Sequence, residues 1–135
     1  MTPSMIARLL ASRWFYVFAR ALLTLPYWTS GIAKLIDLNA ALLEVQKLNL
    51  RPALLILSIS ILIEIGGSIA VIVGCCTWFA AGAQGVFTGL AALLAYPFWT
   101  IADPMLRFGA RNALLEHVGL IGGFMLAAIL AERKR

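Results

Sequence analysis

Four long stretches of the chain are almost entirely apolar, and each is long enough to cross a lipid bilayer as a helix. They cover residues 14–36, 52–74, 78–99 and 113–131. A bilayer core about 30 Å thick requires about 20 residues at a helical rise of about 1.5 Å per residue. The runs are continuous, unlike the short alternating segments of a membrane β-barrel. We therefore predict an all-α membrane protein, an antiparallel bundle of four transmembrane helices forming one domain over residues 1–135.

Polar and helix-breaking residues separate these runs. Asp37 follows the first run, and Arg51-Pro52 opens the second with a proline where a missing N–H does no harm. The connection over residues 74–77 is short enough to join the second and third runs only as an antiparallel hairpin. Asp103-Pro104 is expected to end the third helix. Each helix therefore reverses the direction of the one before it.

The composition agrees with a membrane location. Hydrophobic residues make up 62% of the chain and charged residues 13%, which is outside the range of soluble or disordered proteins. Lys and Arg outnumber Asp and Glu by 11 to 6, but most of these cations lie at the ends of apolar runs, so phospholipid headgroups and not nucleic acid are the expected partner. The first run contains Arg20 and Pro26 and is too long for a signal peptide, so it is expected to remain as a helix.

The distribution of cations suggests an orientation. If both termini share a side, the cations on that side are Arg8, Arg13, Arg133, Lys134 and Arg135. Those on the other side are Lys47, Arg51, Arg107 and Arg111. Arg20 adds to the first group, because its long side chain can extend toward that surface. By the positive-inside rule, we expect the N- and C-termini in the cytoplasm and the chain in the plasma (inner) membrane of a prokaryote.

Polar and small residues recur inside the apolar runs at helical spacing. They form one face in each run: Arg20, Thr24, Tyr27, Gly31 and Lys34; Ser60, Glu64, Gly67 and Ser68; Gln84 and Thr88; and Asn112, Glu116, Gly119 and Gly123. A charged side chain at the bilayer centre costs about 2.5 to 3.5 kcal/mol on insertion scales. We therefore expect these faces to turn inward, with the glycines allowing close helix contact.

The ionisable residues of these faces are the candidate ligand-binding cluster: Arg20, Lys34, Glu64, Glu116 and His117. The helical rise places Glu64 near the midplane and Arg20 about 8 Å toward the N-terminal surface, so we predict a buried Arg20–Glu64 ion pair. Lys34 is then expected to approach Glu116 at the opposite end of the bundle. Such an Arg20–Glu64 pair could hold the helices in register, or it could bind a ligand or a proton.

Two further features bear on cofactors. His117 is the single histidine, and no second histidine or cysteine is near it. We therefore interpret it as a hydrogen-bonded polar residue or as a hydrogen-bond donor to a quinone, in preference to a metal ligand. Cys75 and Cys76 are adjacent, and neighbours bridge only through a strained ring, so we interpret them as free thiols, with a redox pair as the alternative. We predict no metal and no cofactor, with a quinone as the one candidate.

Several segments together are similar to the DoxX family of small four-helix membrane proteins. They are Arg20, the segment Ser30-Gly31-Ile32-Ala33-Lys34-Leu35-Ile36-Asp37, the segment Glu64-Ile65-Gly66-Gly67, and Gly122-Gly123. The order and spacing match over most of the chain. Three positions depart from the family pattern: Trp78 replaces an arginine, Tyr96 a histidine, and Glu116-His117 a Lys-Asn pair. Chemistry tied to those positions does not carry over.

Two functions are open, and the resemblance implies the first of them. In the first, the chain is an accessory membrane subunit of quinone- or thiol-linked redox metabolism, the polar cluster binds a quinone headgroup, and electrons come from a membrane or redox protein partner. In the second, it is a non-enzymatic protein that binds lipid or assists assembly of a membrane partner. A transporter is a weaker third reading, because four helices enclose a narrow pore unless the chain forms a homo-oligomer. Whether the chain is itself an enzyme stays open at this point.

Overall fold

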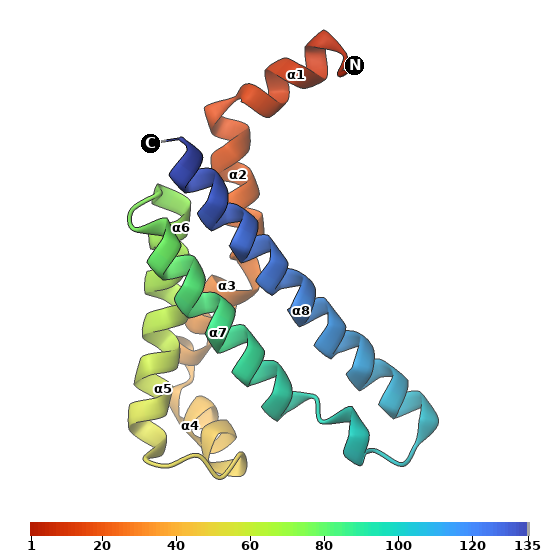
Figure 1. Cartoon of the computed structure of the whole chain (residues 1–135). Coiled ribbons are helices and arrows are strands. Elements are labelled where there is room, and N and C mark those ends of the chain that lie inside the picture. The colour runs from red at the N-terminus through yellow and green to blue at the C-terminus, as the bar shows by residue number, and fades with distance from the viewer. Residues whose placement is uncertain (135) are drawn as a thin grey trace.

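The computed structural model describes residues 1–134, and all regular structure in them is helical, which confirms the predicted all-α class. The elements, labelled in Figure 1 where there is room, are α1 (Ser4–Ala11), α2 (Arg13–Leu23), α3 (Leu25–Ile36), α4 (Leu38–Lys47), α5 (Ala53–Ile61), the π-helical turn η1 (Leu62–Gly66), α6 (Gly67–Val73), α7 (Thr77–Ala95), the 3-10 turn η2 (Phe98–Thr100) and α8 (Pro104–Arg133).

Three stretches of the described residues are long and apolar enough to cross a membrane. They are Ala53–Val73, Thr77–Thr100 and Pro104–Arg133. The last starts well before residue 113, because the Asp103 carboxylate caps the helix by accepting hydrogen bonds from the amides of Met105 and Leu106 at 3.0 and 2.9 Å.

The first apolar run differs from the single straight helix that we predicted. It is divided into α2 and α3, which meet at Thr24. The hydroxyl of Thr24 donates to the carbonyl of Arg20 at 2.9 Å, and Pro26 has no N–H with which to continue the ladder from α2. Each half is therefore too short to span a bilayer by itself.

Figure 1 shows that the two ends of the described chain lie at the same end of the molecule. The turn between α6 and α7 also lies at this end, whereas α4 and the connection between α7 and α8 lie at the opposite end. The α6–α7 turn is tight because Gly74 and Cys76 both adopt left-handed backbone conformations, with φ of 87° and 47°. We call the end that holds the termini the terminal end.

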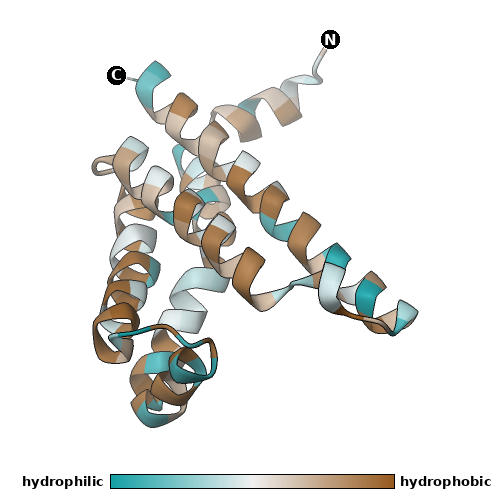
Figure 2. Ribbon diagram, turned by 60° about the horizontal axis from the view of Figure 1, so that its bottom comes forward, coloured by the Kyte–Doolittle hydropathy of each residue, from teal (hydrophilic) through white to brown (hydrophobic). Residues whose placement is uncertain are grey.

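Most large apolar side chains point away from the bundle. Figure 2 shows apolar residues along the length of the long helices, and Leu62, Val86 and Leu126 are each more than 60% exposed. An apolar exterior of this extent would be unfavourable in water and suits lipid.

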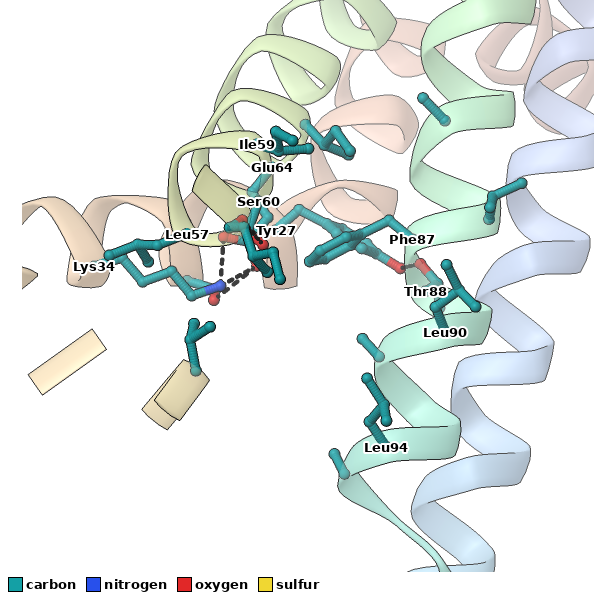
Figure 3. Close-up of a pocket in the computed structure, with 18 of the residues that line it drawn as sticks. Tyr27, Lys34, Leu57, Ile59, Ser60, Glu64, Phe87, Thr88, Leu90 and Leu94 are labelled. Atoms are coloured by element: carbon teal, nitrogen blue, oxygen red, sulfur yellow. Dashed lines mark hydrogen bonds and ion pairs between the residues drawn. The ribbon is translucent and has the colours of Figure 1, made fainter. Parts of the chain in front are cut away.

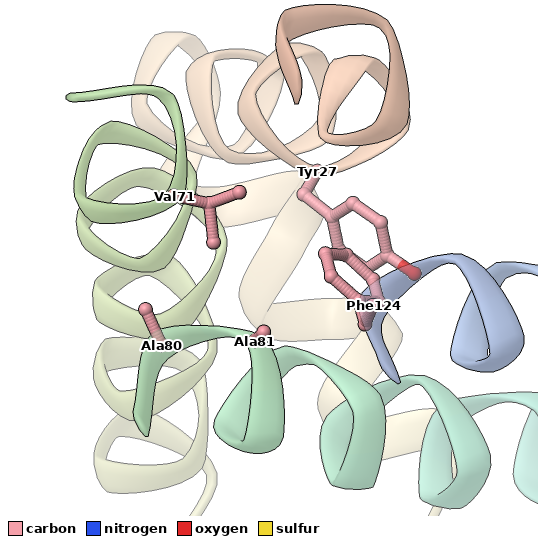
Figure 4. Close-up of a cluster of buried hydrophobic side chains, with 5 residues drawn as sticks. All are labelled: Tyr27, Val71, Ala80, Ala81 and Phe124. Atoms are coloured by element: carbon pink, nitrogen blue, oxygen red, sulfur yellow. The ribbon is translucent and has the colours of Figure 1, made fainter. Parts of the chain in front are cut away.

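The buried core is correspondingly small. It contains Tyr27, Val71, Ala80, Ala81 and Phe124, which come from four different helices (Figure 4). The rings of Tyr27 and Phe124 meet edge to face with centroids 5.2 Å apart. Ala80 and Ala81 are small and let the helices approach closely. The closely packed interior also holds buried polar side chains.

Candidate functional site: an ion pair at the base of an apolar groove

The charged centre of the molecule is an ion pair between α3 and η1. The Lys34 ammonium donates to both carboxylate oxygens of Glu64, at 2.7 and 2.8 Å. The Ser30 hydroxyl, one helical turn before Lys34, donates to the first of these oxygens at 3.1 Å. The Glu64 side chain is 5% exposed and the Lys34 side chain 20% exposed. The carboxylate is therefore enclosed and neutralised, whereas the ammonium borders open space.

Glu64 is held at this position by an irregular stretch of helix. It is the middle residue of the π-helical turn, in which carbonyl groups are displaced from the regular α-helical ladder. The Ser68 hydroxyl donates to the Glu64 carbonyl, and the Gln84 amide of α7 donates to the Ser68 hydroxyl at 3.0 Å. The same amide lies 3.4 Å from the carbonyl oxygens of Ile63 and Glu64. Gln84, fully buried, thus supports the turn that carries the carboxylate.

Close helix contact makes this arrangement possible. A methyl group on Gly31 of α3 would lie 2.5 Å from a side-chain carbon of Ile65 and 3.3 Å from Cβ of Glu64. A methyl group on Gly67 would lie 3.0 Å from the Gln84 side chain. Glycine at these two positions brings both α3 and α7 against the π-helical turn.

A second buried hydrogen-bonded chain joins α3 to α7. The Thr88 hydroxyl donates to the carbonyl of Gln84 at 2.6 Å, so the Tyr27 hydroxyl, which contacts the same oxygen, acts as the donor between the two side chains. Thr88 is 1% exposed and Tyr27 6% exposed. Their contact fixes the wall opposite the ion pair, as Figure 3 shows.

An elongated groove leads to these polar groups. Its volume is about 1260 Å³, and α3, α4, α5, η1, α7 and α8 supply its walls. Apolar side chains dominate the lining, among them Leu57, Ile59, Phe87, Leu90 and Leu94 (Figure 3). Lys34, Ser30 and Glu64 meet at one place in it. The Lys34 ammonium lies 5.9 Å from the centre of the Phe87 ring, across the groove on α7. This is the form of a site for an amphipathic molecule.

The structure brings together three of the five predicted site residues. Lys34, Glu64 and His117 line the groove, whereas Arg20 and Glu116 do not. The predicted Arg20–Glu64 ion pair is wrong, because the Glu64 carboxylate pairs with Lys34 instead. The predicted approach of Lys34 to Glu116 is wrong for the same reason, and Glu116 is exposed on α8.

His117 contributes a second polar group to the groove. Its Nδ1 lies 2.7 Å from the carbonyl oxygen of Ala113, which can only accept, so Nδ1 carries a proton. In the neutral ring, Nε2 is then an acceptor. The imidazole also lies against the Tyr96 ring, with centroids 5.2 Å apart. No group of three or more potential metal ligands occurs in residues 1–134.

Sequence reasoning missed two contributors to the site. Ser30 was not identified as a partner of Glu64, although it precedes Lys34 by four residues and so shares its helix face. Gln84 was placed on an inward face, but its support of the π-helical turn could not be foreseen, because an α-helical spacing rule contains no such turn.

One protein-family model matches the chain. The DoxX family model matches residues 15–97, which run from α2 to the end of α7 and include the ion pair and most of the groove. The chain belongs to the DoxX family. This confirms the resemblance seen in the sequence, and together with the apolar helices it identifies a DoxX-like membrane protein. His117 lies outside the matched segment of this DoxX protein. No curated protein and no solved structure matched the chain.

Proposed function

We propose that this DoxX protein is an accessory membrane subunit of quinone- or thiol-linked redox metabolism, and that its groove binds the headgroup of a quinone. The observation that carries the proposal is the position of the Lys34 ammonium. It donates two hydrogen bonds to Glu64, at 2.7 and 2.8 Å, and it borders the groove, so its third N–H can donate to a bound molecule. A quinone carbonyl accepts such a hydrogen bond, and the apolar walls suit its isoprenoid tail.

The charge balance favours a neutral headgroup. Lys34 and Glu64 cancel, so an anionic ligand would gain little from the ammonium, whereas a polar uncharged group keeps the pair intact. The neutral His117 ring presents Nε2 as an acceptor at the groove, which suits a hydroxyl of the reduced quinol and not a quinone carbonyl. The chain would hold the quinone in place, and a redox protein partner would supply electrons.

The proposal includes a membrane arrangement. We infer that α2 with α3, α5 with α6, α7 and α8 make four crossings of a prokaryotic plasma membrane, with both termini in the cytoplasm. The common location of the two chain ends supports an even number of crossings (Figure 1). The broken first helix then lies across the bilayer with Thr24, where its two halves meet, fully buried, as lipid requires of irregular backbone.

The test is a titration of the purified chain in lipid nanodiscs with a short-tailed ubiquinone analogue, followed by tryptophan fluorescence quenching. We expect saturable binding that Lys34→Met weakens by about tenfold, the scale of one charge-assisted hydrogen bond. Ala83→Phe, which narrows the groove without touching the ion pair, should also weaken it. Ile69→Phe, on an exposed position of α6 outside the groove, and Glu116→Gln are the matched controls. Absence of saturable quenching in the wild type would overturn the proposal.

A second candidate is a protein that holds a membrane lipid in the groove or presents it to a membrane partner. The length of the apolar lining, from Leu57 on α5 to Leu94 on α7, favours it, because acyl chains need no polar contact along that path. Mass spectrometry of co-purifying lipids separates the two. Lipid retained by the wild type and by Lys34→Met but lost in Ala83→Phe would favour lipid binding over quinone binding.

A further inference from the structure

Arg20 is a buried cation outside the ion pair that joins Lys34 and Glu64. It is 8% exposed, its Nε is buried without a hydrogen-bond partner, and within residues 1–134 no ion pair includes it. The guanidinium lies close to the carboxyl end of α6, where a methyl group on Gly74 would meet Nη1 at 2.8 Å. The negative end of that helix is equivalent to roughly half a charge, so it offsets only part of the guanidinium.

A second cation shares the same aromatic ring. The Arg20 guanidinium carbon lies 4.2 Å from the centre of the Tyr16 ring, and the Lys134 ammonium lies 3.7 Å from it. Tyr16 thus brings together α2 and the last described turn of the chain. Two like charges held by one ring repel each other, and an anion between or beside them would relieve this repulsion.

Hydroxyl groups accompany these cations. Among residues 1–134, Tyr16 Oη is buried without a hydrogen-bond partner, and so is the hydroxyl of Thr77, the first residue of α7, which follows Gly74 by one short turn. Buried polar atoms are nearly always paired, so several such atoms at one end of the bundle indicate that this end binds a further polar group. Guanidinium, ammonium and two hydroxyl donors are the groups that bind phosphate.

The depth agrees with a headgroup. Arg20 lies about 10 Å along α2 from its first residue, Arg13, which places the guanidinium within reach of the interfacial layer. Arg8, Arg13 and Arg133 are exposed at the same end and make its surface basic. An anion approaching this end is therefore attracted before it meets Arg20.

We propose that Arg20, Lys134, Tyr16 and Thr77 form a phosphate-binding site at the terminal end, separate from the groove, and occupied by the phosphate of a lipid headgroup or by free phosphate. Arg20 supplies the buried charge, Lys134 closes the site from the exposed side, and the two hydroxyls donate to phosphate oxygens. No bond is made or broken, and the site does not depend on the quinone proposal.

The test is thermal unfolding of the detergent-solubilised full chain, followed by tryptophan fluorescence, with dioleoyl phosphatidylglycerol, dioleoylglycerol or inorganic phosphate added. We expect phosphatidylglycerol to raise the unfolding temperature saturably and dioleoylglycerol, which has no phosphate, to leave it unchanged. Lys134→Gln should raise the half-saturating concentration by about tenfold, the scale of a charge-assisted contact. Arg133→Gln removes an equal charge from the neighbouring exposed position and should change it by less than about twofold.

Inorganic phosphate distinguishes the two sources. Stabilisation by inorganic phosphate that Lys134→Gln weakens identifies free phosphate, and stabilisation by phosphatidylglycerol alone identifies the lipid headgroup. Arg20→Lys keeps the charge but loses the planar donor set, so it should weaken phosphate binding without abolishing it. Equal effects of Lys134→Gln and Arg133→Gln, or equal stabilisation by the two lipids, would overturn the proposal. Quinone binding should be unaffected by Lys134→Gln, so either proposal can fail alone.

Discussion

Lys34 on α3 donates to both carboxylate oxygens of Glu64 in the π-helical turn, and this ion pair joins the broken first helix to the second apolar stretch. In lipid, either charge without the other would be costly, whereas together they are neutral. The pair therefore holds α3 against η1 and also presents a donor to the groove.

Removing one member of the pair should destabilise the protein more than removing both. Glu64→Gln leaves Lys34 without its counter-charge, and we expect a loss of about 3 kcal/mol in the free energy of unfolding, the lower end for a buried pair because Lys34 is partly exposed. Combining it with Lys34→Met should recover most of this loss. The measurement is equilibrium unfolding in mixed micelles.

Glu116→Gln is the matched control, since it removes a carboxylate that is exposed on α8. We expect a change within about 0.5 kcal/mol. Equal losses for Glu64→Gln and Glu116→Gln would show that the ion pair does not hold the helices together.

The contact between α3 and η1 should be sensitive to a single methyl group. Gly31→Ala places Cβ 2.5 Å from Ile65 Cγ1, so the Ile65 side chain or one of the two helices must shift, and we expect a loss of about 1 to 3 kcal/mol in the free energy of unfolding. Quinone binding should weaken as well, because Glu64 lies in the displaced turn.

Gly82→Ala on α7 provides the comparison, since no atom lies within 4 Å of its added methyl group. Alanine favours helix over glycine by about 1 kcal/mol, so this variant should be at least as stable as the wild type. A Gly31→Ala protein as stable as Gly82→Ala would mean that α3 and η1 are not in close contact.

The sequence predicted the inward faces of the first three apolar runs well, but on the fourth run Glu116 and Gly119 are exposed. It predicted the pairing across these faces poorly. The spacing rule placed Lys34, Glu64, Gln84 and Thr88 on polar faces, and the structure brings all four into the interior or the groove. The predicted partner of Glu64 was wrong because the depth of Arg20 in the bilayer was counted along a straight first helix. The break at Thr24 separates Arg20 from Lys34, so that Arg20 lies by Gly74 and Lys34 meets the carboxylate.

Glu116 and His117 illustrate a second limit. Adjacent residues on a helix point about 100° apart, so both cannot face one groove. The structure turns His117 toward the groove and leaves Glu116 exposed. Only the packing of α8 against α7 decides which of the two is used, and that packing is not encoded in their spacing.

Gln84 should be required for the π-helical turn. Gln84→Leu keeps the volume of the side chain but removes the donor to Ser68 and to the displaced carbonyls, and we expect a loss of about 1 to 3 kcal/mol. Because the turn carries Glu64, quinone affinity should fall with it. Gln46→Leu, at an exposed position on α4, should leave both unchanged.

Infrared spectroscopy with 13C-labelled carbonyl groups at Glu64 provides a direct readout. In the wild type the labelled carbonyl accepts from Ser68, and in Gln84→Leu its absorption should shift as the turn rearranges. An unshifted band together with unchanged stability would show that η1 forms without Gln84.

The arrangement of the helices predicts which side of the membrane each connection reaches. Cys75 and Cys76 are exposed in the α6–α7 turn at the terminal end, whereas Asn39 on α4 and Met105 at the start of α8 are exposed at the opposite end. A membrane-impermeant maleimide should label the native cysteines from the cytoplasmic side only. In a Cys75→Ser/Cys76→Ser background, Asn39→Cys and Met105→Cys should be labelled only from the outside. Two short helices joined at Thr24 can form a re-entrant pair as well as a crossing. Labelling of Asn39→Cys from the same side as Cys75 would therefore mean that the α2–α3 segment enters and leaves the bilayer on one face.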